Sequence, residues 1–354
     1  MSSIPEQKHA QAVQPIALLG VPGSPYTRKM LALLRYRRIP YRLILGSHTG
    51  EAPAGLPVSK VKLLPTFYLP DAQGTLQAVT DSTPLIRRFE AEYPGRHAVP
   101  ADPVLALLDA LIEDYADEWL TKAMFHYRWS YAPDIRKAGQ ILPVWARGPQ
   151  SDETLQSNAS MISQRQISRL RYVGSHEGTA RVIESSYERF LDALEAHLKS
   201  HRFVLGARPG SSDFGLYGQL TQLAHFDPTP VALAESRAPR VCGWTGLMED
   251  LSGLEPAESD WFNAEALPQT VHRLLQEVGR VYPSVLLANA AALESGAAHV
   301  RTQIDGVEWV QDPFVYQGKC LAWLRRDYAA LSVEDRARCD RVLQGTGCEA
   351  IFQS

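Results

Sequence analysis

The sequence predicts an α/β domain followed by an all-helical domain and a C-terminal extension. An apolar run at 15–19 leads through a Gly- and Pro-rich turn into a helical pattern, which is typical of a strand that ends at a helix. A second short apolar run, at 63–71, has a proline near its start and precedes a further strand and helix. Beyond residue 103, apolar residues return at three- and four-residue steps, which indicates helices.

Chemistry is expected at the junction between the first strand and the first helix. Ser24 precedes Pro25, and this pair is typical of a helix start, because serine accepts from free backbone N–H groups and proline suits the first helical position. The unpaired N–H groups there favour a thiolate or another anion. A dithiol oxidoreductase would have Cys-Pro-x-Cys, whereas this chain has Ser-Pro-Tyr-Thr. Ser24 is therefore either a capping residue only or a capping residue that also contacts a ligand.

The remaining elements of the first domain follow closely. Strands are predicted at 41–45, 63–71 and 75–79. Pro65 removes one ladder donor from its strand, which suits an edge position or a cis peptide. Asp81 and Ser82 then stand at the start of a capped helix.

The order strand, helix, strand, strand, strand, helix is that of a thioredoxin-like domain, and with these motifs the chain resembles the glutathione S-transferase superfamily. In that family the proline that opens the third strand is cis and the residue before it pairs with the glutathione backbone, which implies these roles for Pro65 and Leu64. An acidic residue followed by serine at the next helix start holds the γ-glutamyl group. The resemblance thus assigns that group to Asp81 and Ser82.

The resemblance continues into the helical part. The segment 203–220 is similar to the family's segment in which an aspartate at a helix start, here Asp213, stabilises the all-helical domain. The family usually has Ser or Thr three residues earlier, and this chain has Gly210. Glycine gives up the reciprocal side-chain bond of a capping box, so the departure concerns local stability rather than activity.

The helical domain offers one candidate pocket. Residues 104–129 read as one long helix that ends in a cluster of aromatic and basic residues: Phe125, His126, Arg128 and Trp129. In the resembled family this helix faces the first domain across the cleft, so the cluster is either an acceptor-substrate pocket or part of the core. The arginine-bearing stretch 146–178 is either a mobile hairpin or a helix pair.

Four segments follow from these patterns. They are a disordered N-terminal tail at 1–14, a thioredoxin-like glutathione-binding domain at 15–95, a helical acceptor-substrate domain at 104–262 and an extension at 263–354. In the extension, helices are expected at 264–295, 316–328 and 333–343. Asp305 and Gly306 lie between two strand patterns and predict a tight hairpin, which must pack against helices of this chain or against a partner subunit.

Composition narrows the class of protein. The chain has 354 residues, 45% of them hydrophobic, and a net charge of -3, which does not suggest a nucleic-acid binder or a polybasic membrane anchor. The first residues have no apolar signal core, and the apolar run at 285–293 is too short to cross a bilayer. Four cysteines lack metal-ligand spacing, so no metal is expected. These features predict a cytoplasmic protein without membrane insertion.

The resemblance implies an enzyme of the glutathione S-transferase type, with glutathione as co-substrate and a small apolar electrophile as acceptor. The reaction is transfer, isomerisation or reductive cleavage. An ionised glutathione thiol needs hydrogen bonds and positive potential at sulfur. Ser24 is the first candidate for the donor and Tyr26 the second, since Tyr26 already lies inside the helix.

Two further expectations concern the oligomeric state and whether the protein is an enzyme. A homodimer is predicted. The alternative to an enzyme is a non-catalytic family member that uses the fold for ligand binding or as a scaffold, which the unfamiliar extension favours and the Asp81–Ser82 pair disfavours.

Overall fold

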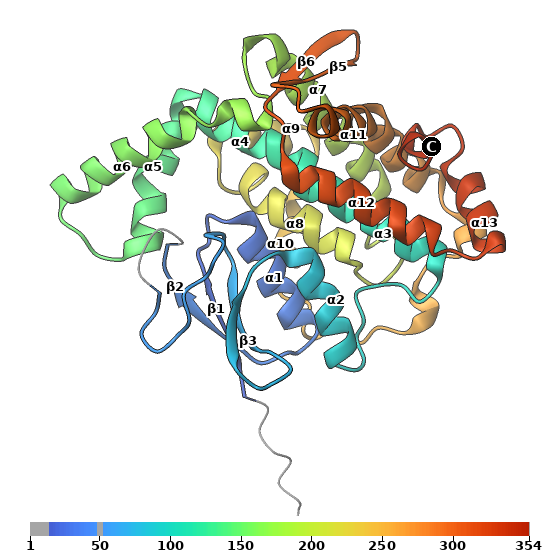
Figure 1. The fold of residues 1–354 in the computed structure, drawn as a ribbon, viewed down its shortest axis with the longest axis horizontal. Helices are drawn as coiled ribbons and strands as arrows, with labels where there is room; N and C mark the ends of the chain where they lie inside the picture. The colour runs from blue at the N-terminus through green and yellow to red at the C-terminus, as the bar shows by residue number, and fades with distance from the viewer. Residues whose placement is uncertain (1–13, 48–51, 354) are drawn as a thin grey trace, which may run out of the picture.

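A computed structural model of the chain describes residues 14–47 and 52–353. The tail predicted at 1–14 lies outside the described residues, except for Gln14. Figure 1 shows a sheet domain at one end of the molecule, a helical domain stacked on it, and the C-terminal helices lying along the helical domain.

The first domain is a four-stranded mixed sheet with helices. Its elements are β1 (Ile16–Gly20), α1 (Pro25–Tyr36), β2 (Tyr41–Leu45), β3 (Thr66–Pro70), β4 (Leu76–Val79) and α2 (Ser82–Glu92). The strand order is β2-β1-β3-β4, with β1 parallel to β2 and antiparallel to β3. The predicted thioredoxin-like order is confirmed.

Helix α8 (Ser211–Leu223) is the central element of the helical domain, because all of its residues are buried. It packs on α1 through Gly218, where an added Cβ would lie 2.6 Å from the carbonyl oxygen of Pro25. Only glycine permits this approach. The close packing joins the helix that begins at Ser24 to the helical domain.

The start of α8 shows how the chain compensates for Gly210. The Asp213 carboxylate accepts from the N–H of Gly210 at 2.8 Å and from that of Val204 at 3.0 Å. The missing capping side chain is replaced by Asp109, whose carboxylate accepts from the N–H groups of Ser211 at 3.1 Å and Ser212 at 2.9 Å. A Cβ on residue 210 would lie 2.3 Å from the Asp109 carboxylate, so glycine makes room for this cap.

The predicted long helix at 104–129 is helical throughout but not uniform. It consists of α3 (Pro103–Tyr115), the π-helical turn η1 (Ala116–Leu120) and α4 (Thr121–Ser130). A π turn inserts one extra residue and rotates the following face, and such turns are frequent at functional sites. This turn bears two buried carboxylates, Asp117 and Glu118.

The other helices complete the domain. They are α5 (Ala132–Arg147), α6 (Asp152–Ile167), η2 (Leu170–Val173), α7 (Glu177–His197), α9 (Pro228–Arg237) and α10 (Pro239–Leu247). The stretch 146–178, expected as a mobile hairpin or a helix pair, contains one α-helix, α6, followed by the short η2, and α6 packs against α5, which precedes the stretch. The two approach closely at Gly139, where a Cβ would lie 2.8 Å from the Ser163 hydroxyl.

The extension packs on the helical domain of its own chain. The short η3 (Glu258–Asp260) precedes it, and it contains η4 (Ala264–Ala266), α11 (Gln269–Ser295), β5 (Val300–Ile304), β6 (Val307–Gln311), α12 (Val315–Ala329), α13 (Val333–Leu343) and η5 (Cys348–Ile351). The predicted hairpin turn is confirmed, with φ of 53° at Asp305 and 76° at Gly306. Trp309 of β6 packs on Trp119, with ring centroids 5.3 Å apart. Within 14–47 and 52–353, no helix has both the length and the apolar character that crossing a membrane requires.

Candidate functional site

Ser24 lies at the N-terminus of α1 as predicted. Its φ of -97° and ψ of 116° are extended, and its hydroxyl accepts from the N–H of Thr27 at 3.2 Å. Pro25 occupies the first helical position. The half-buried hydroxyl thus stands beside the free N–H groups of the helix start, where the helix dipole favours an anion.

The strand start at Leu64 and Pro65 lies next to Ser24. The Leu64–Pro65 peptide is cis, as expected. The Ser24 hydroxyl donates to the carbonyl oxygen of Leu64 at 3.4 Å. The fold therefore brings together two of the sequence-derived site positions that are forty residues apart in the chain.

Tyr26 is directed away from this junction. Its hydroxyl donates to the backbone carbonyl of Asp117 at 2.8 Å and lies 3.4 Å from the Thr121 hydroxyl. Burial, together with the carboxylates of Glu118 and Asp117, raises the pKa of Tyr26 well above its usual value. The phenol therefore keeps its proton, and that proton is already donated within the protein.

The loop before Ser24 is fixed from the helical domain. Gln222 donates to the carbonyl oxygen of Pro22 at 3.1 Å, and the Arg128 guanidinium lies 3.3 Å from that of Gly23. Arg128 also forms a buried ion pair with Asp227 at 2.8 Å. Because the Arg128–Asp227 pair is buried, the Arg128 side chain is held in one orientation, and it holds the loop before Ser24 in place.

Asp81 precedes α2 in an uncommon backbone conformation. Its φ of 86° is rare for a residue with a side chain. The backbone N–H of Thr83 acts on the Asp81 carboxylate in the direction that lowers its pKa, but no capping hydrogen bond of regular geometry forms there. Instead, the Asp81 carboxylate accepts from the hydroxyl of Tyr316 of α12 at 2.7 Å. Burial raises the pKa of the half-buried Asp81 carboxyl, and the Tyr316 bond and nearby Lys29 oppose that shift.

Ser82 faces inward. Its hydroxyl, 7% exposed, accepts from the ammonium of Lys29 at 3.2 Å. Lys29 is fully buried and pairs with Glu113 at 2.7 Å and Asp117 at 2.5 Å. Burial alone would lower the pKa of Lys29, but the two carboxylates outweigh it and raise that pKa. The base of the site is thus a buried ion cluster beneath the start of α2.

The four residues predicted for an acceptor pocket have different environments. His126 is buried, with Nδ1 2.8 Å from the Ser175 hydroxyl, and burial lowers its pKa against the opposing effect of Glu184. Trp129 is buried in a small core cluster, and Arg128 is used in its ion pair. Phe125 alone keeps a partly exposed side chain. The acceptor pocket therefore stays a prediction, and of the four residues only Phe125 has a side chain that could contact an acceptor without leaving the core.

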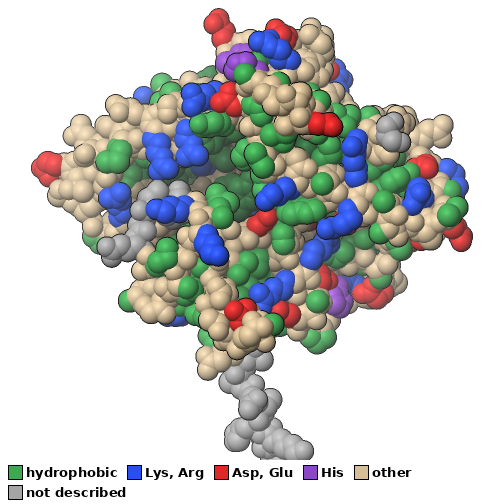
Figure 2. Space-filling model, in the orientation of Figure 1, with side chains coloured by type: hydrophobic (Ala, Val, Ile, Leu, Met, Phe, Trp, Pro, Cys, Tyr) green, Lys and Arg blue, Asp and Glu red, His purple; other side chains and the backbone are tan. Residues whose placement is uncertain are grey.

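One face of the molecule is hollowed (Figure 2). Figure 2 shows the hollow between the α5–α6 pair and the sheet domain, with hydrophobic and basic side chains at its rim. Residues of α5 approach the loop before Ser24, because a Cβ on Gly23 would lie 2.3 Å from Leu142 and 3.3 Å from the Trp145 ring. Apolar side chains thus lie next to the residue that precedes Ser24.

Several residues of the site are not evident from motif matching. Asp109, Glu113 and Asp117 are spaced by four, which places them on one helix face and is a signal that sequence reasoning missed. Lys29 and Tyr316 have no such signal, because their partners lie far away in sequence. Among the described residues, no group of three His, Cys, Asp or Glu side chains is arranged to hold a metal ion.

Comparisons with solved structures give distant likenesses. A glutathione S-transferase from Methylobacterium radiotolerans, in complex with glutathione sulfonate, is 16% identical, with 67% of this chain and 91% of that chain covered and a TM-score of 0.42. A glutathione transferase from Pseudomonas putida with glutathione disulfide bound is 12% identical, with 68% of this chain and 88% of that chain covered and a TM-score of 0.42. A poplar glutathione transferase is 17% identical, with 68% of this chain and 95% of that chain covered and a TM-score of 0.41. No curated protein matches the chain.

Two family models match the sequence directly. The model of the glutathione S-transferase N-terminal domain matches residues 18–97, and that of the C-terminal domain matches residues 166–249. The first covers the sheet domain, and the second runs from the end of α6 to α10. The α5–α6 pair and the extension lie almost wholly outside both. In this order, on these domains, the matches show that the chain belongs to the glutathione S-transferase superfamily.

Proposed function

We propose that this protein binds glutathione as a co-substrate and activates its thiol at the N-terminus of α1, for reaction with a small apolar electrophile. The observation that supports this most is the placement of Ser24. Its hydroxyl stands at a helix start and within 3.4 Å of the Leu64 carbonyl, beside the cis Leu64–Pro65 peptide. One ligand could thus place sulfur at the hydroxyl and its backbone along the strand start.

The chemistry follows from stabilising the thiolate. A thiol with a usual pKa of about 8.5 is mostly protonated at neutral pH, so activation requires groups that favour S⁻. The Ser24 hydroxyl would donate to sulfur and the α1 N–H groups would supply positive potential. Tyr26 is the less suitable donor because its proton is given to the Asp117 carbonyl.

The other end of glutathione is assigned to the start of α2. The carboxylate of Asp81 is half-buried and would receive the γ-glutamyl ammonium. Ser82 would act mainly through its backbone N–H, because its hydroxyl is in contact with Lys29. The apolar acceptor is assigned to the apolar side chains of Leu142 and Trp145 near Gly23, and to Phe125 of the same cluster.

Titration calorimetry with glutathione tests the binding step, and S-methylglutathione serves as the ligand that cannot ionise. We expect binding of both, and ionisation of the bound thiol at a pH below that of free glutathione. Turnover of an aryl halide with glutathione would support an enzyme. Binding without turnover of any electrophile would favour the non-catalytic alternative, and no binding would refute the proposal.

A further inference from the structure

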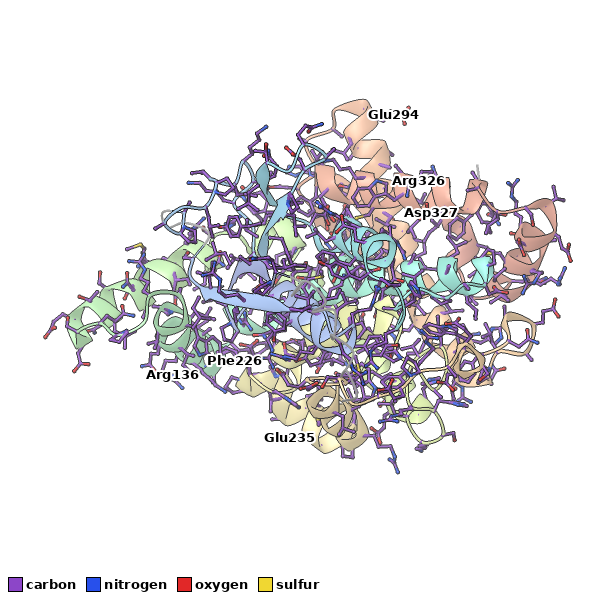
Figure 3. All side chains as sticks on the ribbon, turned by 90° about the horizontal axis from the view of Figure 1, so that it is seen from below. Arg136, Phe226, Glu235, Glu294, Arg326 and Asp327 are labelled. Carbon is purple, nitrogen blue, oxygen red and sulfur yellow. The ribbon has the colours of Figure 1, made fainter. Side chains whose placement is uncertain are left out.

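A hydrogen bond joins the extension to the sheet domain. The hydroxyl of Tyr316, in the first turn of α12, donates to the Asp81 carboxylate at 2.7 Å across 235 positions of sequence. In Figure 1, α12 runs along the helical domain on the side of α2 and α3, and in Figure 3 its residues Arg326 and Asp327 lie away from Phe226 and Arg136. The extension thus stands at the Asp81 end of the site, opposite the α5–α6 pair.

The first turn of α12 is held rigidly. The fully buried side chain of Asn289 on α11 donates to the Phe314 carbonyl at 2.9 Å and accepts from the Phe314 N–H at 2.8 Å. Gln317 donates to the buried Glu118 carboxylate at 3.1 Å. These bonds fix the backbone at Phe314 and the side chain of Gln317, so the first turn of α12 is held in place on both sides of Tyr316.

The Asp81 carboxylate takes its well-formed side-chain hydrogen bond from Tyr316. It makes no capping hydrogen bond of regular geometry at the start of α2, although the backbone N–H of Thr83 acts against the rise of its pKa on burial. Residues at a strained positive φ, such as Asp81, persist when their surroundings hold them in place. Tyr316 contacts one carboxylate oxygen, Oδ1, and a carboxylate has acceptor sites for several donors. Asp81 can therefore hold Tyr316 and a ligand ammonium together.

We propose that Tyr316 is a positioning residue of the glutathione site, through which the C-terminal extension holds the Asp81 carboxylate toward the γ-glutamyl ammonium. The extension is then part of the ligand site and not an appendage. Because this role rests on the glutathione site proposed above, its test must separate the two.

The experiment is a binding cycle with two ligands and three proteins. The ligands are glutathione and glutaryl-cysteinylglycine, which lacks only the α-amino group. The proteins are the full chain, Tyr316→Phe and the control Tyr328→Phe, which removes a similar Tyr-to-Asp bond, to Asp340 at 2.6 Å, from the other end of α12. Thermal unfolding of each protein shows whether it is folded.

We expect Tyr316→Phe to weaken glutathione binding about tenfold and to leave the affinity for glutaryl-cysteinylglycine unchanged. Tyr328→Phe should change neither. An equal loss for both ligands would mean a merely structural role and would overturn the inference. Unchanged or tighter glutathione binding by Tyr316→Phe would also overturn it while leaving the proposed function intact. Failure of the unaltered chain to bind glutathione would refute both.

Discussion

Replacing Ser24 by alanine separates its structural role from its chemical role. The hydroxyl accepts from the Thr27 N–H at 3.2 Å, and loss of such a cap lowers the free energy of unfolding by about 0.5–2 kcal/mol. The same hydroxyl donates to Leu64 at 3.4 Å, well beyond the usual O–H···O length of about 2.7–2.8 Å. Because this hydrogen bond is weak, little free energy is lost when the Ser24 proton turns from the Leu64 carbonyl toward a bound sulfur.

The chemical role has its own expected magnitude. A hydrogen bond to a charged group contributes about 1.5–3 kcal/mol, and one pKa unit corresponds to about 1.4 kcal/mol. Ser24→Ala should therefore raise the pKa of enzyme-bound glutathione by about 1–2 units, lower turnover at neutral pH and change glutathione affinity little. The thiolate absorbance of the complex, titrated against pH, measures this directly.

Tyr26→Phe is the matched control in the same helix turn. It removes the donor to the Asp117 carbonyl, so a small loss of stability is expected without a shift of the thiol pKa. A larger pKa rise in Tyr26→Phe than in Ser24→Ala would refute the assignment and make the tyrosine the activating group. No rise in either variant would leave the helix N-terminus as the source of activation.

Four further substitutions test the surroundings of the site. Asp81→Ala should weaken glutathione binding by about 1.5–3 kcal/mol in calorimetry, whereas Ser82→Ala should weaken it less and lower stability. Arg128→Leu leaves the buried Asp227 unpaired and should lower the free energy of unfolding in urea by about 3–5 kcal/mol, with partial recovery when Asp227→Leu is added. Glu118→Gln should make stability less dependent on pH.

The sign of the Glu118 effect follows from its raised pKa. Burial, with Asp114 adding to it, raises the pKa of Glu118 well above its usual value. The unfolded chain therefore loses this proton first as pH rises from about 4, and stability declines by up to about 1.4 kcal/mol per pH unit. Glu118→Gln removes that slope toward neutral pH, and the exposed Glu308→Gln serves as control. Equal slopes in wild type and Glu118→Gln would contradict the assignment.

A matched control for Asp81 lies in the same domain. Asp71→Ala removes another carboxylate, one that accepts from backbone N–H groups in the β3–β4 turn and is exposed at its surface. It should leave glutathione affinity unchanged. An equal loss of glutathione affinity in Asp71→Ala and Asp81→Ala would show that the net charge of the domain, and not the position of Asp81, determines binding.

Local chemistry explains which elements the sequence predicts well. The Asp305–Gly306 hairpin follows from two residues that tolerate positive φ between alternating strands. Ser24 followed by Pro25 predicts a helix start, and the structure has the first helix beginning at Pro25 with Ser24 as its N-cap. In both cases the determining interactions lie within four residues, so the pattern along the chain contains them.

Features set by distant partners are not available from such patterns. The π turn at 116–120 follows from packing, since nothing in the apolar periodicity distinguishes it. Gly210 looks like a weakened cap until Asp109 is seen to supply the missing carboxylate. The aromatic cluster at 125–129 was open to two interpretations, and only three-dimensional contacts distinguish a buried ion pair from a ligand pocket.

The position of the extension also explains why point substitution is a better test of its role than truncation. Its buried Gln317 contacts Glu118, and Tyr282 donates to Asp114 at 2.6 Å, so the extension covers carboxylates of the long helix. Removing it would expose those carboxylates and the Trp119 face that Trp309 covers. A truncated chain would lose stability and glutathione binding together, whichever role Tyr316 has. Tyr316→Phe keeps the ring and its packing and removes one hydroxyl, so a change in ligand affinity can be attributed to the bond with Asp81.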